Sequence, residues 1–292
     1  MPNSEIPAVV KRFYGANAVV LLPDGREEVA QTSSRNKSLV CGDRVILELR
    51  FGTYYVVDTE SRCTEFCRTD GFGRRKVIAA NIDQIALVIA AQPEPHFHAI
   101  DRYWVAALNC AIPMVLLVNK ADLASTERLE KIADLYPPLG LETFSVSAKT
   151  GDGVDELKAL FSDKLSVLVG QSGAGKSSLV NRLCINAEVA VGELSSLREE
   201  GRHTTTTTDF FELESRGRIM DSPGIREFGL GQYDQSSLEE GFVEISELAG
   251  ECRFRNCVHQ NTPGCAVISA MQAGKIDERR VKSYQSLLAQ IT

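Results

Sequence analysis

Hydrophobic residues alternate with polar ones along the first part of the chain. The runs "NAVVLL", "REEVAQT", "DRVILEL" and "TYYVVDTE" are separated by the turn signals "PDG", "CGD" and "FG". A period of two residues with frequent Gly and Asp predicts short antiparallel strands. We predict a five-stranded β-barrel of the oligonucleotide-binding (OB) type over residues 1–75, and both RNA binding and a purely structural role are open to it.

Unbroken apolar runs replace this alternation between residues 76 and 235. They are "QIALVIAA", "PMVLLVN", "ETFSVSA", "LSVLVG" and "GRIMDSPG", and helical stretches such as "AIDRYWVAALNCA" and "KSSLVNRLC" lie between them. Strands buried on both faces and alternating with helices predict a largely parallel sheet in an α/β domain. Ligands of such sheets bind at the carboxyl ends of the strands.

Helical periodicity returns in the last part, residues 236–292, which also carries a cysteine cluster. In "DERRVKSYQSLLAQI", apolar residues recur at helical spacing after Asp277, which can cap a helix. These apolar positions are Val281, Tyr284, Leu288 and Ile291.

Composition supports a globular chain of two or three domains, with 292 residues, 43% hydrophobic and 24% charged. No apolar run approaches the roughly 18 residues of a membrane-spanning helix, and the first residues lack a secretion signal, so we expect a cytoplasmic protein without a membrane partner. In a reducing compartment, clustered cysteines are better explained as metal ligands than as disulfides. Cys63 and Cys67 stand apart from any further ligand and are expected to be barrel residues.

The net charge of −7, from 32 basic and 39 acidic residues, excludes binding to nucleic acid through overall positive charge. Residues 1–70 carry 9 basic and 10 acidic residues, residues 71–240 carry 17 and 24, and residues 241–292 carry 6 and 5. An RNA partner would therefore meet local patches in the two flanking segments.

The stretch "GQSGAGKSS" follows an apolar run and opens a helical stretch, as a phosphate-binding loop does. Its backbone N–H groups and the helix N-terminus would bind the phosphates of GTP, Lys176 would contact the β and γ phosphates, and Ser177 would bind Mg²⁺. The predicted loop consists of Gly170, Gln171, Ser172, Gly173, Ala174, Gly175, Lys176, Ser177 and Ser178.

Two further stretches, "VNKAD" and "VSAK", each end an apolar run and predict guanine recognition. The Asp122 carboxylate can accept from the N1 and N2 donors of guanine, a pattern that adenine lacks. The Ala148 N–H can meet the guanine O6. The predicted base-binding residues are Asn119, Lys120, Ala121, Asp122, Ser147, Ala148 and Lys149.

"DSPG" and "GRHTTTTT" supply the expected switch segments. Asp221 would hold Mg²⁺ through water, Gly224 would sense the γ phosphate, and Thr205, with Thr204 as second choice, would complete the metal shell. Ile225 stands where many GTPases carry a glutamine that orients water, so His203 is the candidate for assisting hydrolysis, the alternative being a surface histidine. Because "DSPG" leads directly to the C-terminal module, we hypothesise that γ-phosphate sensing reaches that module.

The order of these motifs along the chain is unusual, because "NKAD" precedes the phosphate loop by about fifty residues. Surface connections can be exchanged when termini lie close together, and the order fits a GTPase that has been cut and rejoined. We therefore predict an α/β fold in which a circularly permuted P-loop GTPase domain (76–235) lies between an N-terminal OB-fold barrel (1–75) and a C-terminal zinc-binding helical domain (236–292).

Three cysteines and a histidine lie within fourteen residues of "ECRFRNCVHQNTPGCAV". Four protein ligands of this kind suit one tetrahedral Zn²⁺ with no open position, which is a structural site. The predicted ligands are Cys252, Cys257, His259 and Cys265. Arg253 and Arg255 in the same loop are candidate phosphate contacts.

The barrel, the permuted order, "GRHTTT", "DSPGIREFGL" and the C-x4-C-x-H-x5-C cluster together resemble the ribosome small-subunit-dependent GTPase A family of bacterial assembly factors. The resemblance implies a GTPase that binds the small (30S) ribosomal subunit and its rRNA late in maturation, is stimulated by it, and helps other assembly factors leave. It also implies that His203 acts in hydrolysis.

Two other functions compete with this one. The first is an RNA-binding checkpoint in which nucleotide is mainly a conformational ligand, and Ile225 favours it. The second is a GTPase of tRNA modification or membrane traffic, which has no support because this sequence carries no lipidation signal and no cysteine placed as a nucleophile. We expect a monomer.

Overall fold

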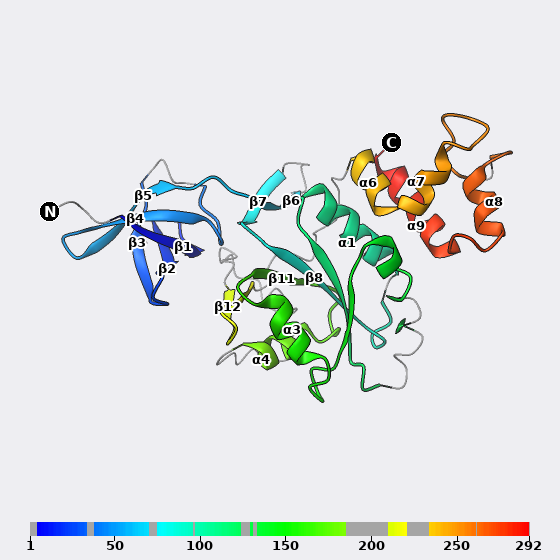
Figure 1. Cartoon of the computed structure of the whole chain (residues 1–292). Coiled ribbons are helices and arrows are strands. Elements are labelled where there is room, and N and C mark those ends of the chain that lie inside the picture. The colour runs from blue at the N-terminus through cyan, green and yellow to red at the C-terminus, as the bar shows by residue number, and fades with distance from the viewer. Residues whose placement is uncertain are drawn as a thin grey trace, which may run out of the picture.

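The protein consists of a barrel, a central α/β domain and a helical lobe arranged side by side (Figure 1). The computed structural model describes residues 5–33, 38–69, 75–95, 97–123, 129–130, 133–184, 210–220, 234–260 and 262–291. The barrel lies at one end of the molecule and the helical lobe at the other, so the central domain contacts both.

The N-terminal part is a closed five-stranded barrel, as predicted. Its strands, in the order β1-β2-β3-β5-β4, are β1 (Ile6–Phe13), β2 (Asn17–Leu21), β3 (Glu27–Gln31), β5 (Thr53–Thr59) and β4 (Arg44–Arg50). All neighbours are antiparallel except β3 and β5. The turn between β4 and β5 has positive φ at Phe51 (49°) and Gly52 (81°), which matches the twist of a two-residue hairpin and leaves the Phe51 ring fully exposed.

A separate hairpin, β6 (Glu65–Thr69) and β7 (Arg75–Ala80), follows the barrel. Phe66 of β6 is fully buried and belongs to the core of the central domain rather than to the barrel core. The expectation that Cys63 and Cys67 are barrel residues is therefore wrong. Cys67 lies on β6 and Cys63 is exposed just before it. The alternation of the hairpin resembles that of the barrel strands, which hid this difference.

Backbone contacts join the barrel to the central domain. The N–H of Ala80 donates to the carbonyl of Cys41 at 2.9 Å, and Asn81 donates from Nδ2 to the carbonyl of Gly42 at 2.9 Å. Gly42 has a φ of 89°, and a methyl group there would lie 2.0 Å from the carbonyl oxygen of Ala80. Only glycine allows this approach.

The central sheet has the predicted parallel organisation and the predicted permuted order. Its strands run in the order β10 (Thr143–Val146), β9 (Met114–Asn119), β8 (Gln84–Ala90), β11 (Leu165–Val169), β13 (Arg218–Met220) and β12 (Phe210–Glu212). Only β12 is antiparallel to its neighbour. Strand β8 therefore lies between β9, which leads into "NKAD", and β11, which leads into the phosphate loop.

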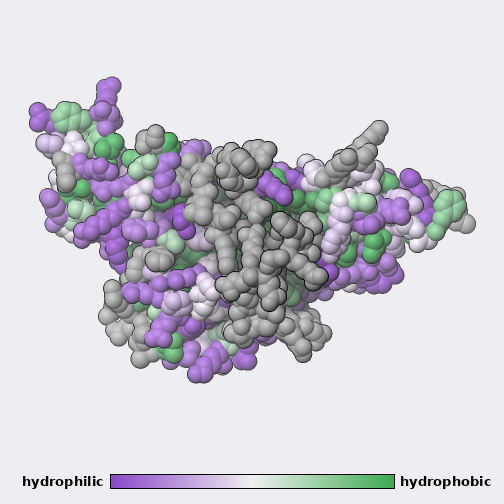
Figure 2. All heavy atoms as spheres, turned by 180° about the vertical axis from the view of Figure 1, so that it is seen from behind, coloured by the Kyte–Doolittle hydropathy of each residue, from purple (hydrophilic) through white to green (hydrophobic). Residues whose placement is uncertain are grey.

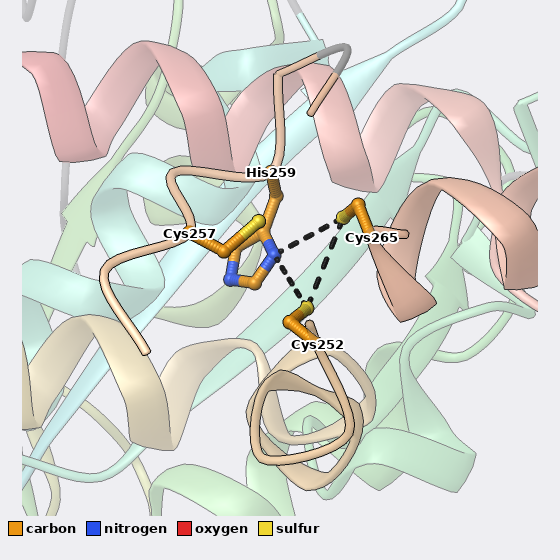
Figure 3. A group of neighbouring side chains, drawn as sticks. All are labelled: Cys252, Cys257, His259 and Cys265. Atoms are coloured by element: carbon orange, nitrogen blue, oxygen red, sulfur yellow. Dashed lines mark hydrogen bonds between the residues drawn. The ribbon is translucent and has the colours of Figure 1, made fainter. Parts of the chain in front are cut away.

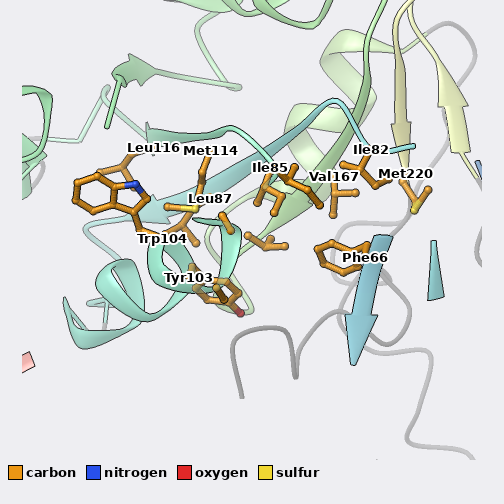
Figure 4. Close-up of a cluster of buried hydrophobic side chains, with 14 of the residues drawn as sticks. Phe66, Ile82, Ile85, Leu87, Tyr103, Trp104, Met114, Leu116, Val167 and Met220 are labelled. Atoms are coloured by element: carbon orange, nitrogen blue, oxygen red, sulfur yellow. The ribbon is translucent and has the colours of Figure 1, made fainter. Parts of the chain in front are cut away.

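Helices cover both faces of this sheet, which is why its strands are apolar throughout. Alternate residues of β8 point to opposite faces: Ile85 and Leu87 belong to one core cluster and Ala86 and Val88 to the other. The helices in the described part of the domain are α1 (Phe97–Asn109), the short 3-10 helix η2 (Pro137–Leu139), α3 (Val154–Phe161) and α4 (Lys176–Leu183). Figure 4 shows Trp104 and Tyr103 of α1 along the same side of the sheet as Phe66 of the hairpin.

Over residues 234–260 and 262–291, the C-terminal lobe contains four helices: α6 (Gln235–Gly241), α7 (Val243–Ala249), α8 (Ala266–Gln272) and α9 (Glu278–Ile291). The predicted terminal helix is α9, and the Asp277 side chain accepts from the N–H of Arg279 at 2.9 Å at its start. The lobe packs on α1, where Val105 joins the core of the lobe. Gly241 of α6 lies so close to Val105 that a methyl group at Gly241 would clash with that side chain.

A buried arginine fastens the lobe to the central domain. Arg280 of α9 is 2% exposed, donates to Asp101 of α1 at 2.5 Å and to Glu244 of α7 at 2.7 Å, and lies over the ring of Phe242 at 4.1 Å. Tyr136 donates to the same Asp101 at 3.0 Å. A buried charge needs such partners, so α1 and α9 are held in one position.

None of the helices in the described part of the chain is long and apolar enough to cross a membrane. The face in Figure 2 is mainly hydrophilic over the described residues, with hydrophobic residues in small groups among them.

Candidate functional site

The phosphate loop follows β11 and requires glycine at two positions. A methyl group at Gly170 would lie 2.1 Å from the carbonyl oxygen of Val88, and one at Gly175 would lie 2.2 Å from Nδ2 of Asn119. Both residues have positive φ, 135° and 96°. The loop therefore curls tightly against β8 and β9, and α4 begins at once with Lys176.

Asn119 joins the two halves of the candidate nucleotide site. It ends β9, is 1% exposed, and donates from Nδ2 to the carbonyl of Ala174 at 2.9 Å. Its Oδ1 accepts from the N–H of Ala148 at 3.3 Å. One side chain thus connects the "NKAD" loop, the "SAK" loop and the phosphate loop, although the last follows fifty-five residues later in the chain.

Asp122 is oriented by the "SAK" loop. Ser147 donates from Oγ to Asp122 Oδ1 at 2.7 Å, and Lys149 Nζ lies 3.8 Å from Oδ2. The hydrogen bond from Ser147 is the main cause that lowers the pKa of Asp122 below its ordinary value. The group is a fixed carboxylate with acceptor oxygens, as recognition of guanine N–H groups requires.

Lys176 folds back over the phosphate loop. Its Nζ donates to the carbonyls of Gly170 at 2.8 Å and Gln171 at 3.0 Å, and the residue is 7% exposed. Ser177, 6% exposed, follows it on the first turn of α4. A cation and a hydroxyl therefore lie beside a curled backbone, which is the arrangement that binds phosphate and its metal.

The predicted switch residues lie outside the described residues. These are His203, Thr204, Thr205, Asp221, Gly224 and Ile225. The described strand β13 ends at Met220, directly before Asp221, and pairs with β11 in parallel, Val167 opposite Met220. The chain thus leaves the sheet beside the strand that leads into the phosphate loop.

Sequence reasoning missed two contributors to this site. The carbonyl of Gln92, in the turn after β8, accepts from Lys120 Nζ at 2.7 Å. Pro93 in the same turn borders the phosphate loop, because a methyl group at Gly173 would lie 3.1 Å from its Cδ. A backbone carbonyl acts regardless of its side chain, so no residue type marked Gln92.

The four predicted metal ligands form one cluster in the C-terminal lobe (Figure 3). Cys252 Sγ lies 3.6 Å from His259 Nδ1 and 3.9 Å from Cys265 Sγ, and Cys265 Sγ lies 3.5 Å from His259 Nδ1. A tetrahedral zinc ion with bonds of about 2.3 Å to sulfur and 2.0–2.1 Å to nitrogen separates two sulfurs by about 3.8 Å and sulfur from nitrogen by about 3.6 Å. The ligand atoms, including that of Cys257, lie within 4.8 Å of one another, so they fit such an ion.

Burial keeps two of these ligands uncharged when no metal is bound. It raises the pKa of the Cys265 thiol to about 11 and lowers that of the His259 imidazole. A neutral imidazole is ready to bind a metal, whereas the Cys265 thiol must release its proton. The donor set, three sulfurs and one nitrogen, indicates zinc.

Comparison with known proteins agrees with this architecture. The model of the RsgA GTPase family, described as "RsgA GTPase", matches residues 59–231. A protein of Pseudomonas fluorescens named small ribosomal subunit biogenesis GTPase RsgA is 46% identical over 258 residues, which is 87% of this chain and 75% of that protein. The chain belongs to the RsgA GTPase family. An RsgA of Pseudomonas aeruginosa is 41% identical over 280 residues, which is 94% of this chain and 83% of the length of that protein.

Solved structures resemble the RsgA fold found here over nearly the whole chain. YjeQ from Thermotoga maritima superposes with a TM-score of 0.77 at 26% identity, covering 99% of both chains. YloQ, described as a circularly permuted GTPase, gives a TM-score of 0.72 at 22% identity and covers 99% of this chain and 95% of its own. The predicted family and the permuted fold are confirmed, and as an RsgA GTPase the protein is a GTP hydrolase.

Proposed function

We propose that this GTPase acts in the biogenesis of the small ribosomal subunit, as the names of its relatives state for them. In this proposal it binds the subunit late in maturation, hydrolyses GTP when the subunit stimulates it, and promotes the release of other assembly factors. The observation that carries the nucleotide part is the bridge from Asn119 to Ala174 and Ala148, which supports one joined site for base and phosphates. The protein would work as a cytoplasmic monomer.

The guanine base is proposed to bind beside Asp122. Its carboxylate, held by Ser147, would accept from the N1 and N2 groups of guanine. The Ala148 N–H, which donates to Asn119 Oδ1 at 3.3 Å in this structure, would exchange that acceptor for the guanine O6. Adenine offers no pair of donors there, so a desolvated carboxylate would be left without partners. The aliphatic stem of Lys120 would cover the ring, because its ammonium is held by the Gln92 carbonyl.

The phosphates are proposed to bind along the loop from Gly170 to Ser178. Lys176 now donates to two loop carbonyls and would exchange these for β- and γ-phosphate oxygens. Ser177, Thr205 and Asp221 are the proposed Mg²⁺ ligands, and Mg²⁺ would neutralise charge that develops on the phosphate oxygens.

Hydrolysis is proposed to depend on His203, because Ile225 has no polar atom with which to orient water. Gly224 would sense the γ phosphate. His203→Ala should lower subunit-stimulated turnover at least tenfold and leave GTP affinity unchanged. Unchanged stimulated turnover would remove His203 from the mechanism.

The zinc site is proposed to be structural. Cys252, Cys257, His259 and Cys265 supply four ligands and leave no position for a substrate. Zinc would close the loop that carries Arg253 and Arg255, whose backbone is further fixed by a hydrogen bond from Arg253 N–H to the carbonyl of Gly264.

Contacts with rRNA are proposed for the barrel and for the zinc-bound loop, which lie at opposite ends of the central domain (Figure 1). The fully exposed Phe51 lies in the turn between β4 and β5, and the half-exposed Tyr14 lies in the turn between β1 and β2. OB folds bind oligonucleotides with such loops and stack bases on aromatic side chains. Residues 252–276 contain three basic residues and no acidic one, against a net charge of −7 for the whole chain. Phosphate binding at this local patch is therefore favoured.

A GTPase assay with purified small and large subunits tests the proposal. Stimulation by the small subunit alone supports it, and equal or absent stimulation contradicts it. The RNA-binding checkpoint remains the second candidate, favoured by Ile225, and it predicts nucleotide-dependent subunit binding without stimulated phosphate release.

A further inference from the structure

The turn between β8 and α1, residues 91–95, reaches both halves of the nucleotide site. On one side, the Gln92 carbonyl accepts from Lys120 Nζ at 2.7 Å. On the other, Pro93 Cδ lies where it would meet a methyl group on Gly173 at 3.1 Å, so the pyrrolidine ring lies against the phosphate loop. The turn thus contacts the "NKAD" loop and the phosphate loop, although neither Gln92 nor Pro93 belongs to one of the GTPase motifs.

Both ends of this turn are fixed by the core. Upstream, all seven residues of β8 are buried at the centre of the sheet. Downstream, Pro95 is buried and α1 follows, held by the ion pair between Asp101 and Arg280. Packing at both ends therefore sets the position of the turn.

We infer that Gln92 and Pro93 are positioning residues of the GTP site. The Gln92 carbonyl holds the Lys120 ammonium so that the lysine stem lies where the guanine ring binds, and Pro93 supports the phosphate loop at Gly173. The inference rests on the proposed function only in taking a guanine nucleotide as the ligand of this site.

The expected consequence is preorganisation. A loop and a side chain that are already in place lose less conformational freedom when the nucleotide binds, which strengthens binding mainly by slowing dissociation. Loosening the turn should release both contacts together, because they share one short segment of backbone. Pro93→Gly and Lys120→Met should therefore both act by weakening the support that this turn gives to the nucleotide site.

The test measures the dissociation rate of a fluorescent GDP analogue by stopped flow, on the full chain without ribosomes. We expect Pro93→Gly to accelerate dissociation about fivefold and Lys120→Met about tenfold, with the double variant well below the product of about fiftyfold. Glu156→Ala is the control, because it removes an exposed side chain of α3 that belongs neither to the turn nor to the nucleotide site, and it should dissociate like the wild type. Pro93→Ala, which retains more backbone restraint than glycine, should give a smaller acceleration.

A second readout uses the nucleotide-free protein. Hydrogen exchange of amides 170–176 should be faster in Pro93→Gly than in the wild type and unchanged in Glu156→Ala. An unchanged dissociation rate in Pro93→Gly, an equal effect of Glu156→Ala, or strictly multiplicative effects in the double variant would overturn the inference. None of these results depends on stimulation by small subunits, so failure of the proposed function is recognised separately.

Discussion

Asn119 and Ala174 are joined by a hydrogen bond of 2.9 Å between the end of β9 and the middle of the phosphate loop. The donor is encoded before the acceptor, the reverse of the order expected for a GTPase chain. The contact shows physically what permutation preserves: the lateral neighbours in the sheet remain, and only the surface connections differ.

Asn119→Ala should weaken GTP binding about 10- to 100-fold, because it leaves the Ala174 carbonyl and the Ala148 N–H without their buried partner. Isothermal titration calorimetry with GTP and GDP measures the effect. Glu156→Ala, an exposed residue of α3, serves as control and should bind like the wild type. Equal affinities for both variants would show that the bridge does not organise the site.

Ser147→Ala should raise the pKa of Asp122 towards its ordinary value, because the hydrogen bond from Ser147 is the main cause that lowers it. A carboxylate with a lowered pKa stays ionised above that pKa and becomes protonated as the pH falls through that pKa. We therefore expect guanine binding in the wild type to be insensitive to Asp122 protonation from pH 8 down to about 5.

In the variant, the Asp122 titration followed by NMR should move to higher pH, and GTP affinity should fall about five- to tenfold even at pH 7, since the carboxylate loses its orienting donor. Thr150→Ala is a useful comparison, because Thr150 Oγ1 bonds Asp152 at 2.6 Å rather than Asp122. An unshifted Asp122 titration in Ser147→Ala would contradict the assigned cause.

Removal of the metal should unfold the loop from Cys252 to Cys265 without abolishing nucleotide binding. The cluster closes a segment rich in turns, whereas the two faces of the central sheet have cores of their own. Treatment with a strong chelator should release one zinc per chain, accelerate hydrogen exchange across residues 252–265, and leave the affinity for GDP within about twofold. Retained protection of this loop after complete zinc release would contradict a structural role.

Arg280→Met should destabilise the protein by about 3–5 kcal/mol, because it leaves the buried carboxylate of Asp101 and the partly buried carboxylate of Glu244 without their cation. Urea unfolding measures the loss. Arg279→Ala is the control: its pair with Asp277 is partly exposed, so the loss should stay within about 1 kcal/mol. Equal losses in the two variants would show that the buried network does not fasten the lobe.

The periodicity of the chain predicted the barrel and the parallel sheet because burial imposes it directly. Val45 and Leu47 alternate with more exposed residues in β4, whereas every residue of β8 is buried. The β6–β7 hairpin was not separated from the barrel, since Phe66 would alternate in the same way in either context. The predicted domain boundaries at residues 75 and 235 stay predictions.

The sequence could suggest candidate nucleotide and metal ligands because their chemistry depends on side-chain type and spacing, and those assignments stay predictions. The Lys120–Gln92 contact was not, because the acceptor is a backbone carbonyl. Arg280 was not recognised either, because arginine on an amphipathic helix normally faces solvent and only the tertiary structure brings Asp101 and Glu244 to it.

The closeness of Gly42 to Ala80 limits how this barrel could be reused. With 2.0 Å between a hypothetical methyl group and the carbonyl oxygen, the two backbones interlock, and Asn81 completes the joint at the Gly42 carbonyl. Grafting residues 1–60 onto a different GTPase through a simple linker would therefore yield a tethered barrel without a fixed orientation. A fixed orientation would require the recipient to carry the segment 79–81 as well, because that segment supplies the partners of Gly42.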